Sequence, residues 1–285
     1  MSQSGSYTLP DSRQAAQAEL DRLARQASSG WDKESRMLSW FGLNDGMSIL
    51  EAGSGPGFTT ERLLTLVPGS SVTCLDIDRK LLAQAKQYLH NKECRYVNLV
   101  EGSIAHTPFA SDQYDVVYAR FLFQHLTDPA TAAREIWRVL KPGGKLIISD
   151  IDDGLFGVFE PPIPEFTPVL DAFGQAQMTR GGDRHIGRKL AGILQQAGFS
   201  TIDLEALGSH SANRDLDSFL QHLNPDRMQS LVDSQQLSQA DLDAFRTALE
   251  NWAALPDAYT LWLSLMICVE KPSKPQEHPP RQAVR

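Results

Sequence analysis

The chain has 285 residues, of which 41% are hydrophobic and 22% charged, and its formal net charge at pH 7 is −8. This balance is typical of a globular protein, and an acidic chain without a basic stripe argues against a nucleic-acid partner. The longest strongly apolar run, 261–269, is too short to span a bilayer, and the first residues lack a signal-peptide pattern. We therefore expect a cytoplasmic protein with neither a nucleic-acid nor a membrane partner, and the composition leaves a homodimer open.

Helix and strand patterns alternate after a helical start. Apolar residues have helical spacing at 11–27, with Asp11 as the expected N-cap, and again at 33–41. Strands are then expected at 48–52, 71–78, 94–102, 114–120 and 145–151, and helices at 58–67, 79–90 and 129–140. The last of these helices should stop at K-P-G-G, where Gly143 or Gly144 can adopt the left-handed conformation. This alternation predicts a doubly wound parallel α/β sheet, whose ligands bind beyond the carboxyl ends of the strands.

The regular alternation ends at residue 153. A Pro- and Gly-rich apolar loop should follow, then helices at 165–179 and 187–197 and a strand at 200–207. Two further helices are expected, one around 216–223 and one that begins at Ser238, before a final strand at 259–271. The tail at 272–285 has too little apolar content to pack and is expected to be disordered.

The three cysteines, Cys74, Cys94 and Cys268, are scattered and include no C-x-x-C pair. Two of them lie inside apolar runs, where isolated thiols are usually buried and reduced. We expect free thiols rather than a disulfide or a metal site.

Three glycines, at 53, 55 and 57, directly follow the first strand of the alternating part. A glycine row after a strand lets the backbone approach a ligand closely before it turns into a helix. The spacing G-x-G-x-G is not the dinucleotide fingerprint G-x-G-x-x-G, whose third glycine would fall at Phe58. Glu51, which comes just before the glycines, suits an ammonium group better than a pyrophosphate.

The second strand ends in the acidic sequence C-L-D-I-D. An acid at the end of this strand can accept hydrogen bonds from both hydroxyls of a ribose. Asp76 closes the apolar run and is the better candidate, whereas Asp78 suits the N-cap of the following helix.

Together these residues resemble a class I S-adenosylmethionine-dependent methyltransferase of the small-molecule type. The resemblance covers about 45–200 and the final strand, and four segments carry it in order: ILEAGSGPG, VTCLDID, VEGSIAHTPFASDQYDVVYARFLFQHLTDP and REIWRVLKPGGKLIISD. It implies a Rossmann-like, doubly wound, seven-stranded sheet with an antiparallel last strand. It also implies an N-terminal helical lid at 1–44 and a methyltransferase domain at 45–271, with substrate-covering insertions at 154–180 and 208–257.

The resemblance assigns a cofactor site to the ends of the first strands. Glu51 would hold the amino group of S-adenosylmethionine through water. The loop would wrap the methionine part of the cofactor with Ala52, Gly53, Ser54, Gly55 and Gly57.

The nucleoside would lie at the next two strands. Asp76 would take the ribose, and Ile77 would pack against one side of the adenine. Gly102, Ser103 and Ile104 would flank the other side, although many family members have Asp where this chain has Ser103.

Further residues are implied near the transferred methyl group. Ala119 and Arg120 would border the methionine carboxylate, and Arg120 is also a candidate grip for a substrate carboxylate. Tyr7 would close over the cofactor as part of the lid.

The acceptor side has two further candidates. His125 is the best candidate base, because histidine titrates near neutral pH, and the alternative is a hydrogen-bonded structural histidine after the fourth strand. Asp152, with Asp150 and Asp153 in S-D-I-D-D-G, is a candidate base or substrate anchor, and we expect no metal there.

A basic segment and an apolar cover complete the candidates. The segment T-R-G-G-D-R-H-I-G-R-K is either a surface turn or an attractor for an anionic substrate. Apolar residues that could enclose a small molecule, or simply form core, are Leu155, Phe156, Val158, Phe159, Phe166, Phe173, Met178, Phe219, Leu223, Phe245 and Trp252.

The expected activity is methyl transfer from S-adenosylmethionine, which leaves as S-adenosylhomocysteine, to an oxygen, nitrogen or carbon atom of an apolar organic molecule, natural-product-like or lipid-like. One alternative is a nicotinamide-dependent dehydrogenase, against which Phe58 argues. The other is a non-catalytic binding protein that kept the cofactor fold.

Overall fold

The computed structural model describes residues 7, 9–10, 12–155, 157–213 and 216–273. Two helices, α1 (Arg13–Ser28) and α2 (Trp31–Trp40), precede the sheet. Helix α1 begins after Ser12, whose side chain accepts a hydrogen bond from the Ala15 amide. The expected N-cap Asp11 lies outside the described residues, as do 1–6 and 8 of the expected lid and the tail from 274.

Eight strands form one sheet in the order β3-β2-β1-β4-β5-β8-β6, and β7 also pairs with β8. The strands are β1 (Ser48–Ala52), β2 (Ser71–Asp76), β3 (Val97–Glu101), β4 (Tyr114–Arg120), β5 (Leu140–Asp150), β6 (Gly157–Glu160), β7 (Ser200–His210) and β8 (Tyr259–Glu270). Strands β1 to β5 pair in parallel, whereas β8 is antiparallel to its three neighbours. The doubly wound α/β fold with an antiparallel last strand is therefore confirmed.

Strand β6 is an addition that the sequence did not predict, because 154–166 has the composition of a loop. Strand β8 pairs with β5 only over Leu265–Glu270, so its first residues extend beyond β5 and leave a free edge. Strand β6 fills that edge and pairs with Tyr259–Trp262. The sheet consequently has eight strands instead of seven.

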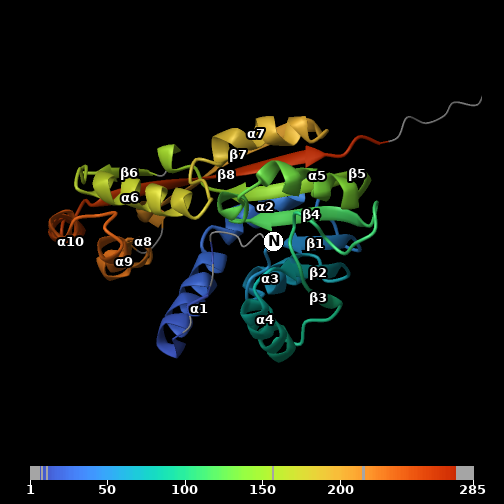
Figure 1. Cartoon of the computed structure of the whole chain (residues 1–285), viewed down its shortest axis with the longest axis horizontal. Helices are drawn as coiled ribbons and strands as arrows, with labels where there is room; N and C mark the ends of the chain where they lie inside the picture. Colours follow the sequence, from blue (N-terminus) through green and yellow to red (C-terminus); the bar gives the residue numbers. More distant parts are fainter. Residues whose placement is uncertain (1–6, 8, 11, 156, 214–215, 274–285) are drawn as a thin grey trace, which may run out of the picture.

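Helices cover both faces of the sheet (Figure 1). On one face α2, α3 (Phe58–Leu66) and α4 (Arg79–Asn91) pack around residues such as Leu38, Leu63 and Leu89. On the other face α5 (Pro129–Val139) and α7 (Gly187–Gln196) pack around Ile136, Leu190 and Leu194. Strands covered on both sides need apolar residues at successive positions, which explains their lack of alternation.

A second apolar core holds a helical cap at one end of the molecule's long axis (Figure 1). The cap comprises α6 (Phe166–Thr179), α8 (Leu216–His222), α9 (Gln229–Asp233) and α10 (Gln239–Ala253). The Ser238 hydroxyl accepts from the Asp241 amide and begins α10 as expected. Phe166, Phe245 and Trp252 are buried in this core.

Two local details complete the fold. Helix α5 ends at Val139, and Gly143, with φ of 79°, lies within β5 rather than at the helix cap that we expected, because Leu140 is already extended. The three cysteines are free, and Cys74 and Cys268 are buried. Within the described ranges, no helix combines the length and apolarity that a bilayer crossing requires.

Candidate functional site

The glycine loop joins β1 to α3, and its three glycines have different constraints. All three have positive φ: 69° at Gly53, 55° at Gly55 and 82° at Gly57. A Cβ at Gly53 would come within 2.9 Å of Leu122, and one at Gly57 would come within 3.1 Å of Leu89. A Cβ at Gly55 would meet nothing within 4 Å. The loop is thus packed at its two ends and open in the middle, which leaves bare backbone for a ligand.

Ser54 provides a second sign of a ligand at this loop. Its amide donates to the Leu75 carbonyl at 3.1 Å, but its buried hydroxyl oxygen has no hydrogen-bond partner of good geometry in the described structure, and the neighbouring Cys74 thiol is at best a weak one. Buried polar groups are nearly always hydrogen-bonded, so this hydroxyl fits a site completed by a polar ligand.

Glu51 ends β1 in a buried position directly beside the loop. The Thr60 hydroxyl donates to its carboxylate at 2.5 Å. Burial raises the pKa of Glu51 from 4.5 to about 8, although Thr60 and the Arg120 charge act in the opposite direction. At neutral pH the folded protein therefore holds this carboxyl mostly in its protonated form.

The raised pKa of Glu51 predicts that stability falls as pH rises. The folded state keeps a proton that the unfolded state releases above pH 4.5. The contribution of Glu51 to the free energy of unfolding is therefore fully present below pH 4.5 and is lost towards pH 8. The free energy of unfolding should fall by about 1 kcal/mol between roughly pH 7 and 8, because the folded state holds on average about 0.7 more protons than the unfolded state over this interval. Urea unfolding at both pH values measures this, and Glu51→Gln should remove most of the slope, because Asp150, another buried carboxyl with a raised pKa, loses most of its proton by pH 8 and contributes to the remainder. An equal slope in the variant would assign the effect to another group.

Asp76 and Asp78 separate into two roles at the end of β2. Asp76 is buried, and its carboxylate accepts from the amides of Gly55 and Asp78, both at 2.8 Å. Burial is the largest influence on its pKa, which is raised. Asp78 caps α4 through the amides of Lys80 and Leu81, as expected from its position. The acid nearest to the open middle of the glycine loop is therefore Asp76.

The other residues predicted for this site gather at the same edge. The Gly102 amide donates to the Asp76 carbonyl at 3.0 Å, which brings 102–104 beside β2. Ile77 is exposed and available for contact, whereas Ile104 is buried in the core. The Ser103 hydroxyl accepts from the Ala105 amide at 3.2 Å. Ala52 and Ala119 are direct partners in the β1–β4 ladder.

Arg120 ends β4 in a buried ion-pair network. Its Nε lies 3.0 Å from both carboxylate oxygens of Glu34, and Nη2 donates to the carbonyls of Gln26 and Ser29. The Tyr118 hydroxyl also donates to Glu34. The network attaches α1 and α2 to the carboxyl end of β4. The sequence reading missed Glu34, although an acid on the otherwise apolar face with Trp31 and Leu38 was a usable signal.

A cavity of about 280 Å³ lies beyond the carboxyl ends of β4 and β5. Phe121, which lines it, precedes Leu122, the residue that contacts Gly53, so the cavity and the glycine loop are neighbours. Its apolar lining residues are Phe121, Ile151, Phe166, Leu170, Phe173, Leu207, Phe219, Leu223, Met228, Trp262 and Leu263, and its charged ones are Arg22, Lys33, Glu34, Arg120, Arg184 and Arg227. Its volume approaches the usual range of ligand pockets, about 300–1,000 Å³.

The apolar cover predicted from sequence divides into three groups. Phe166, Phe173, Phe219 and Leu223 line the cavity. Phe245 and Trp252 belong to the cap core, and Phe159 packs against it. Leu155, Val158 and Met178 are exposed, and Phe156 lies outside the described residues.

His125 and Tyr7 lie together beside the cavity without lining it. Their ring centroids are 5.6 Å apart, and the Tyr7 hydroxyl donates to Glu19 of α1 at 2.9 Å. Burial and the nearby Arg charges lower the pKa of His125 to about 4. His125 is therefore a neutral, weakly basic ring at physiological pH, and this environment favours a structural role.

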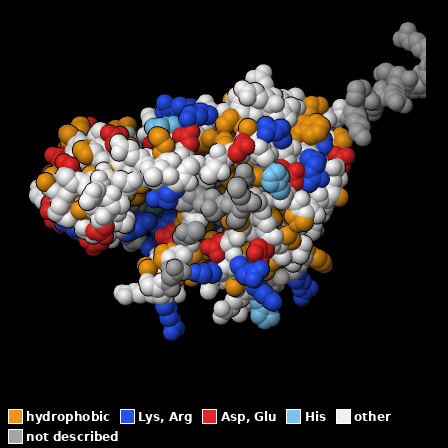
Figure 2. Space-filling view, viewed as in Figure 1, with side chains coloured by type: hydrophobic (Ala, Val, Ile, Leu, Met, Phe, Trp, Pro, Cys, Tyr) orange, Lys and Arg blue, Asp and Glu red, His pale blue; other side chains and the backbone are white. Residues whose placement is uncertain are grey.

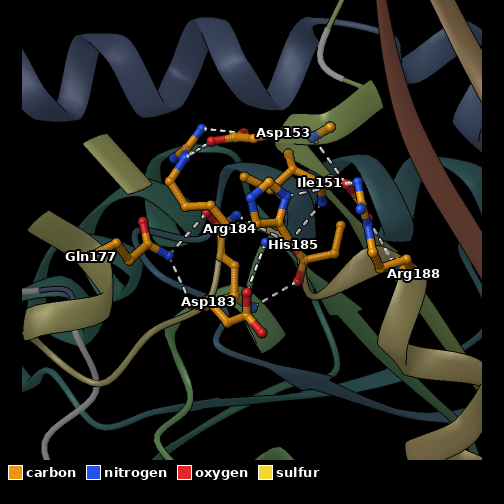
Figure 3. Close-up of polar contacts among 11 residues, drawn as sticks. Ile151, Asp153, Gln177, Asp183, Arg184, His185 and Arg188 are labelled. Atoms are coloured by element: carbon orange, nitrogen blue, oxygen red, sulfur yellow. Dashed lines mark hydrogen bonds and ion pairs between the residues drawn. The ribbon is translucent and has the colours of Figure 1, made fainter. Parts of the chain in front are cut away.

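Acidic side chains of the turn after β5 form ion pairs with basic side chains of the segment 180–189 (Figure 3). Asp153 pairs with Arg184, and both carboxylate oxygens of Asp152 accept from the Arg188 guanidinium. The Asp152 side chain is fully buried and does not line the cavity, and this environment favours a structural role. In the described part of the chain, no group of three or more His, Cys, Asp or Glu side chains is arranged to hold a metal.

Asp150 is the third acid of this turn. It is fully buried and accepts from the backbone amide and side-chain amide of Gln124, at 3.2 and 3.1 Å. Burial raises its pKa to about 7. Gln177 of α6 in turn donates to the Gln124 carbonyl at 2.7 Å, which ties the cap to the sheet.

Comparison with known proteins gives a consistent result. A family described as a methyltransferase domain matches residues 50–148. Over 99 residues the chain is 38% identical to 2-methyl-6-phytyl-1,4-hydroquinone methyltransferase of Arabidopsis thaliana, and this covers 35% of the chain but only 28% of that protein. It is 25% identical to the ubiquinone/menaquinone biosynthesis C-methyltransferase UbiE of Pectobacterium atrosepticum, over 57% of the chain and 70% of that protein.

The fold also has a counterpart among solved structures. Phosphoethanolamine N-methyltransferase 2 of Haemonchus contortus, in complex with phosphomonomethylethanolamine and S-adenosylhomocysteine, superposes with a TM-score of 0.56 at 20% identity. The match covers 85% of this chain and 53% of that one. Residues 50–148 therefore match a methyltransferase domain, and the ordered motifs and the sheet topology of the chain resemble those of the class I S-adenosylmethionine-dependent methyltransferases.

Proposed function

We propose that the protein transfers a methyl group from S-adenosylmethionine to an organic small molecule with a largely apolar body. The observation that carries this proposal is the adjacency of two features at one sheet edge. These are the open glycine loop with the orphan Ser54 hydroxyl, and the aromatic-lined cavity that begins at Phe121. Two relatives named for methylation in quinone biosynthesis support an acceptor with a ring and an apolar body.

The residues at this edge suit the cofactor. Backbone of the Gly53–Gly57 loop would wrap the methionine part, and the Ser54 hydroxyl would gain its missing partner. Asp76 would accept from the ribose hydroxyls, with Ile77 and residues 102–104 on either side of the adenine. The bound cofactor supplies an activated methyl group on a sulfonium leaving group.

The chain contributes orientation and exclusion of water. The cavity would hold the acceptor beyond β4, with α1, α2 and the cap as its walls. Correct orientation of two reactants can lower a barrier by about 7–11 kcal/mol at the upper end, so no additional base is needed for acceptors that are already nucleophilic. Catalytic roles for His125, Arg120 and Asp152 stay predictions. The contacts that these residues make favour a role in positioning the segments around the cavity.

The N-terminal segment 1–44 would act as the lid. The Leu9 amide donates to Asp78 at 3.3 Å, and Tyr7 lies against His125, so the segment crosses the carboxyl ends of β2 and β4. A cofactor that enters at Asp76 would therefore lie beneath or beside this segment.

Calorimetry with S-adenosylhomocysteine tests the cofactor site. We expect saturable binding, and we expect proton release, because a bound ammonium group lowers the raised pKa of Glu51. The release appears as a dependence of the binding enthalpy on the ionisation enthalpy of the buffer, and Glu51→Gln should abolish it. NAD, titrated in parallel, should give no saturation. Saturation with NAD alone would favour the dehydrogenase alternative.

Methyl transfer itself is tested with radiolabelled S-adenosylmethionine and fractionated small-molecule extracts. Label should move into organic-phase material. Binding of S-adenosylhomocysteine without label transfer to any extract would favour a non-catalytic cofactor-binding protein.

A further inference from the structure

The walls of the cavity carry an excess of positive charge that the rest of this acidic chain does not have. Five basic side chains line it, namely Arg22, Lys33, Arg120, Arg184 and Arg227, against one acidic side chain, Glu34. In Figure 2, Lys and Arg side chains gather in the recess between the cap and the rest of the molecule. A basic recess in a chain of net charge −8 is a local feature that the overall composition does not explain.

Three of these five cations have carboxylate partners. Arg120 pairs with Glu34, Arg184 pairs with Asp153, and Arg22 pairs with Glu19. These ion pairs are part of the cavity walls, and in each of them the carboxylate largely neutralises the positive charge.

Neither of the other two cations forms an ion pair at contact distance within the described part of the chain, although the charge of Glu19 acts on Arg227. Lys33 donates to the Gly208 carbonyl, a neutral acceptor. Arg227 makes no hydrogen bond or ion pair with any described residue, and its neighbours include Arg22, whose charge adds to burial in lowering the pKa of Arg227. Arg22 and Arg227 thus share one nearby carboxylate, Glu19, among the described residues, and this wall of the cavity keeps a net positive charge.

The cavity also has an aromatic wall near these cations. Phe219 and Trp262 meet edge to face with centroids 5.0 Å apart, and the Arg184 guanidinium lies 5.9 Å from the Phe173 centroid. Such surfaces take the flat or apolar body of a ligand, while a free guanidinium takes a carboxylate, sulfonate or phosphate in bidentate fashion.

Given the proposed methyl transfer, on which this inference rests, we propose that the acceptor is an organic anion. Its apolar body packs against Phe173, Phe219 and Trp262, and its anionic group binds Arg227, with Lys33 as a second cation. Arg227 thereby selects anionic acceptors over neutral ones of the same shape.

A pair of fluorescent probes tests this selection directly. 1-Anilinonaphthalene-8-sulfonate and N-phenyl-1-naphthylamine share an aromatic body, and only the first carries a negative charge. Each is titrated into the protein with and without saturating S-adenosylhomocysteine. We expect the sulfonate to bind about tenfold more tightly in both conditions, the size expected for one charge-assisted hydrogen-bonded contact. Equal affinities would overturn the inference.

Variants locate the effect. Arg227→Gln should weaken the sulfonate about tenfold and leave the neutral probe unchanged, and Arg227→Lys should keep part of the preference. Arg246→Gln is the matched control, because Arg246 of α10 pairs with Asp226 and does not line the cavity. Equal losses in Arg227→Gln and Arg246→Gln would overturn the assignment to Arg227.

The titrations in the presence of S-adenosylhomocysteine separate two explanations of a preference for the sulfonate, namely an acceptor site and the site of the cofactor's own carboxylate. A sulfonate preference that disappears when S-adenosylhomocysteine is bound would show that the free cations serve the cofactor's own carboxylate, and the inference would then be wrong. Failure of S-adenosylhomocysteine to bind at all would contradict the proposed function, whereas the two probes alone would still report the charge preference of the cavity.

Discussion

Asp76→Ala should raise the dissociation constant for S-adenosylhomocysteine at least tenfold. A buried carboxylate that holds the Gly55 and Asp78 amides is removed, together with the acceptor for two ribose hydroxyls. A tenfold change corresponds to about 1.4 kcal/mol, a modest expectation for hydrogen bonds to a charged group. Calorimetric titration of the purified variant measures it.

Asp78→Ala is the matched control for this prediction. It removes the α4 cap and the acceptor of the Leu9 amide and should cost about 1 kcal/mol of stability, while the dissociation constant rises clearly less than in Asp76→Ala, because Asp78 does not hold the glycine loop. If Asp76→Ala binds as tightly as the unchanged protein, the ribose does not lie at Asp76. If Asp78→Ala weakens binding more than Asp76→Ala does, the two acids have the opposite roles.

Glu34→Ala should lower the free energy of unfolding by about 3–5 kcal/mol, the usual cost of removing one partner of a buried ion pair. Only 8% of the Arg120 side chain and 4% of the Glu34 side chain are exposed, so the guanidinium would remain buried beside two carbonyls without its counter-charge. The Tyr118 hydroxyl would lose its acceptor as well. Urea unfolding at neutral pH measures the loss.

Two variants make this result specific. Asp32→Ala on the exposed side of the same helix should cost less than about 1 kcal/mol, because a first-turn acid contributes only through the helix dipole. Adding Arg120→Met to Glu34→Ala should recover part of the loss by removing the buried charge. A loss below about 1 kcal/mol in Glu34→Ala, or no recovery in the double variant, would mean that water reaches the pair.

The cofactor half of the site could be predicted because it is local in sequence. The three glycines, Glu51 and Asp76 stand at the carboxyl ends of two strands that pair in parallel, and parallel pairing follows from the alternation of strands and helices. Residues at neighbouring strand ends must meet at one edge. The same reasoning separated Asp76 from the helix cap Asp78.

The acceptor half could not be predicted in this way, because its residues come from segments far apart in the chain. Arg22 and Lys33 reach the cavity from the first helices, Arg227 from the cap, and Trp262 from the last strand. No local pattern fixes how the cap turns back over β4 and β5. The basic segment at 180–189 was ambiguous for the same reason, since its acidic partners precede it by about thirty residues.

The sequence by itself determined the doubly wound sheet and the glycine loop with its acidic neighbours, because hydrophobic periodicity and backbone conformation are encoded over a few residues. The antiparallel last strand was implied only by the resemblance to a family. Only the tertiary structure decided which charges are neutralised. Asp152, Asp153 and Arg120 are paired, and Arg227 is left without an ion pair at contact distance among the described residues. Pairing of charges depends on distances across the fold, and these distances follow from the packing of the cap and the first helices on the sheet.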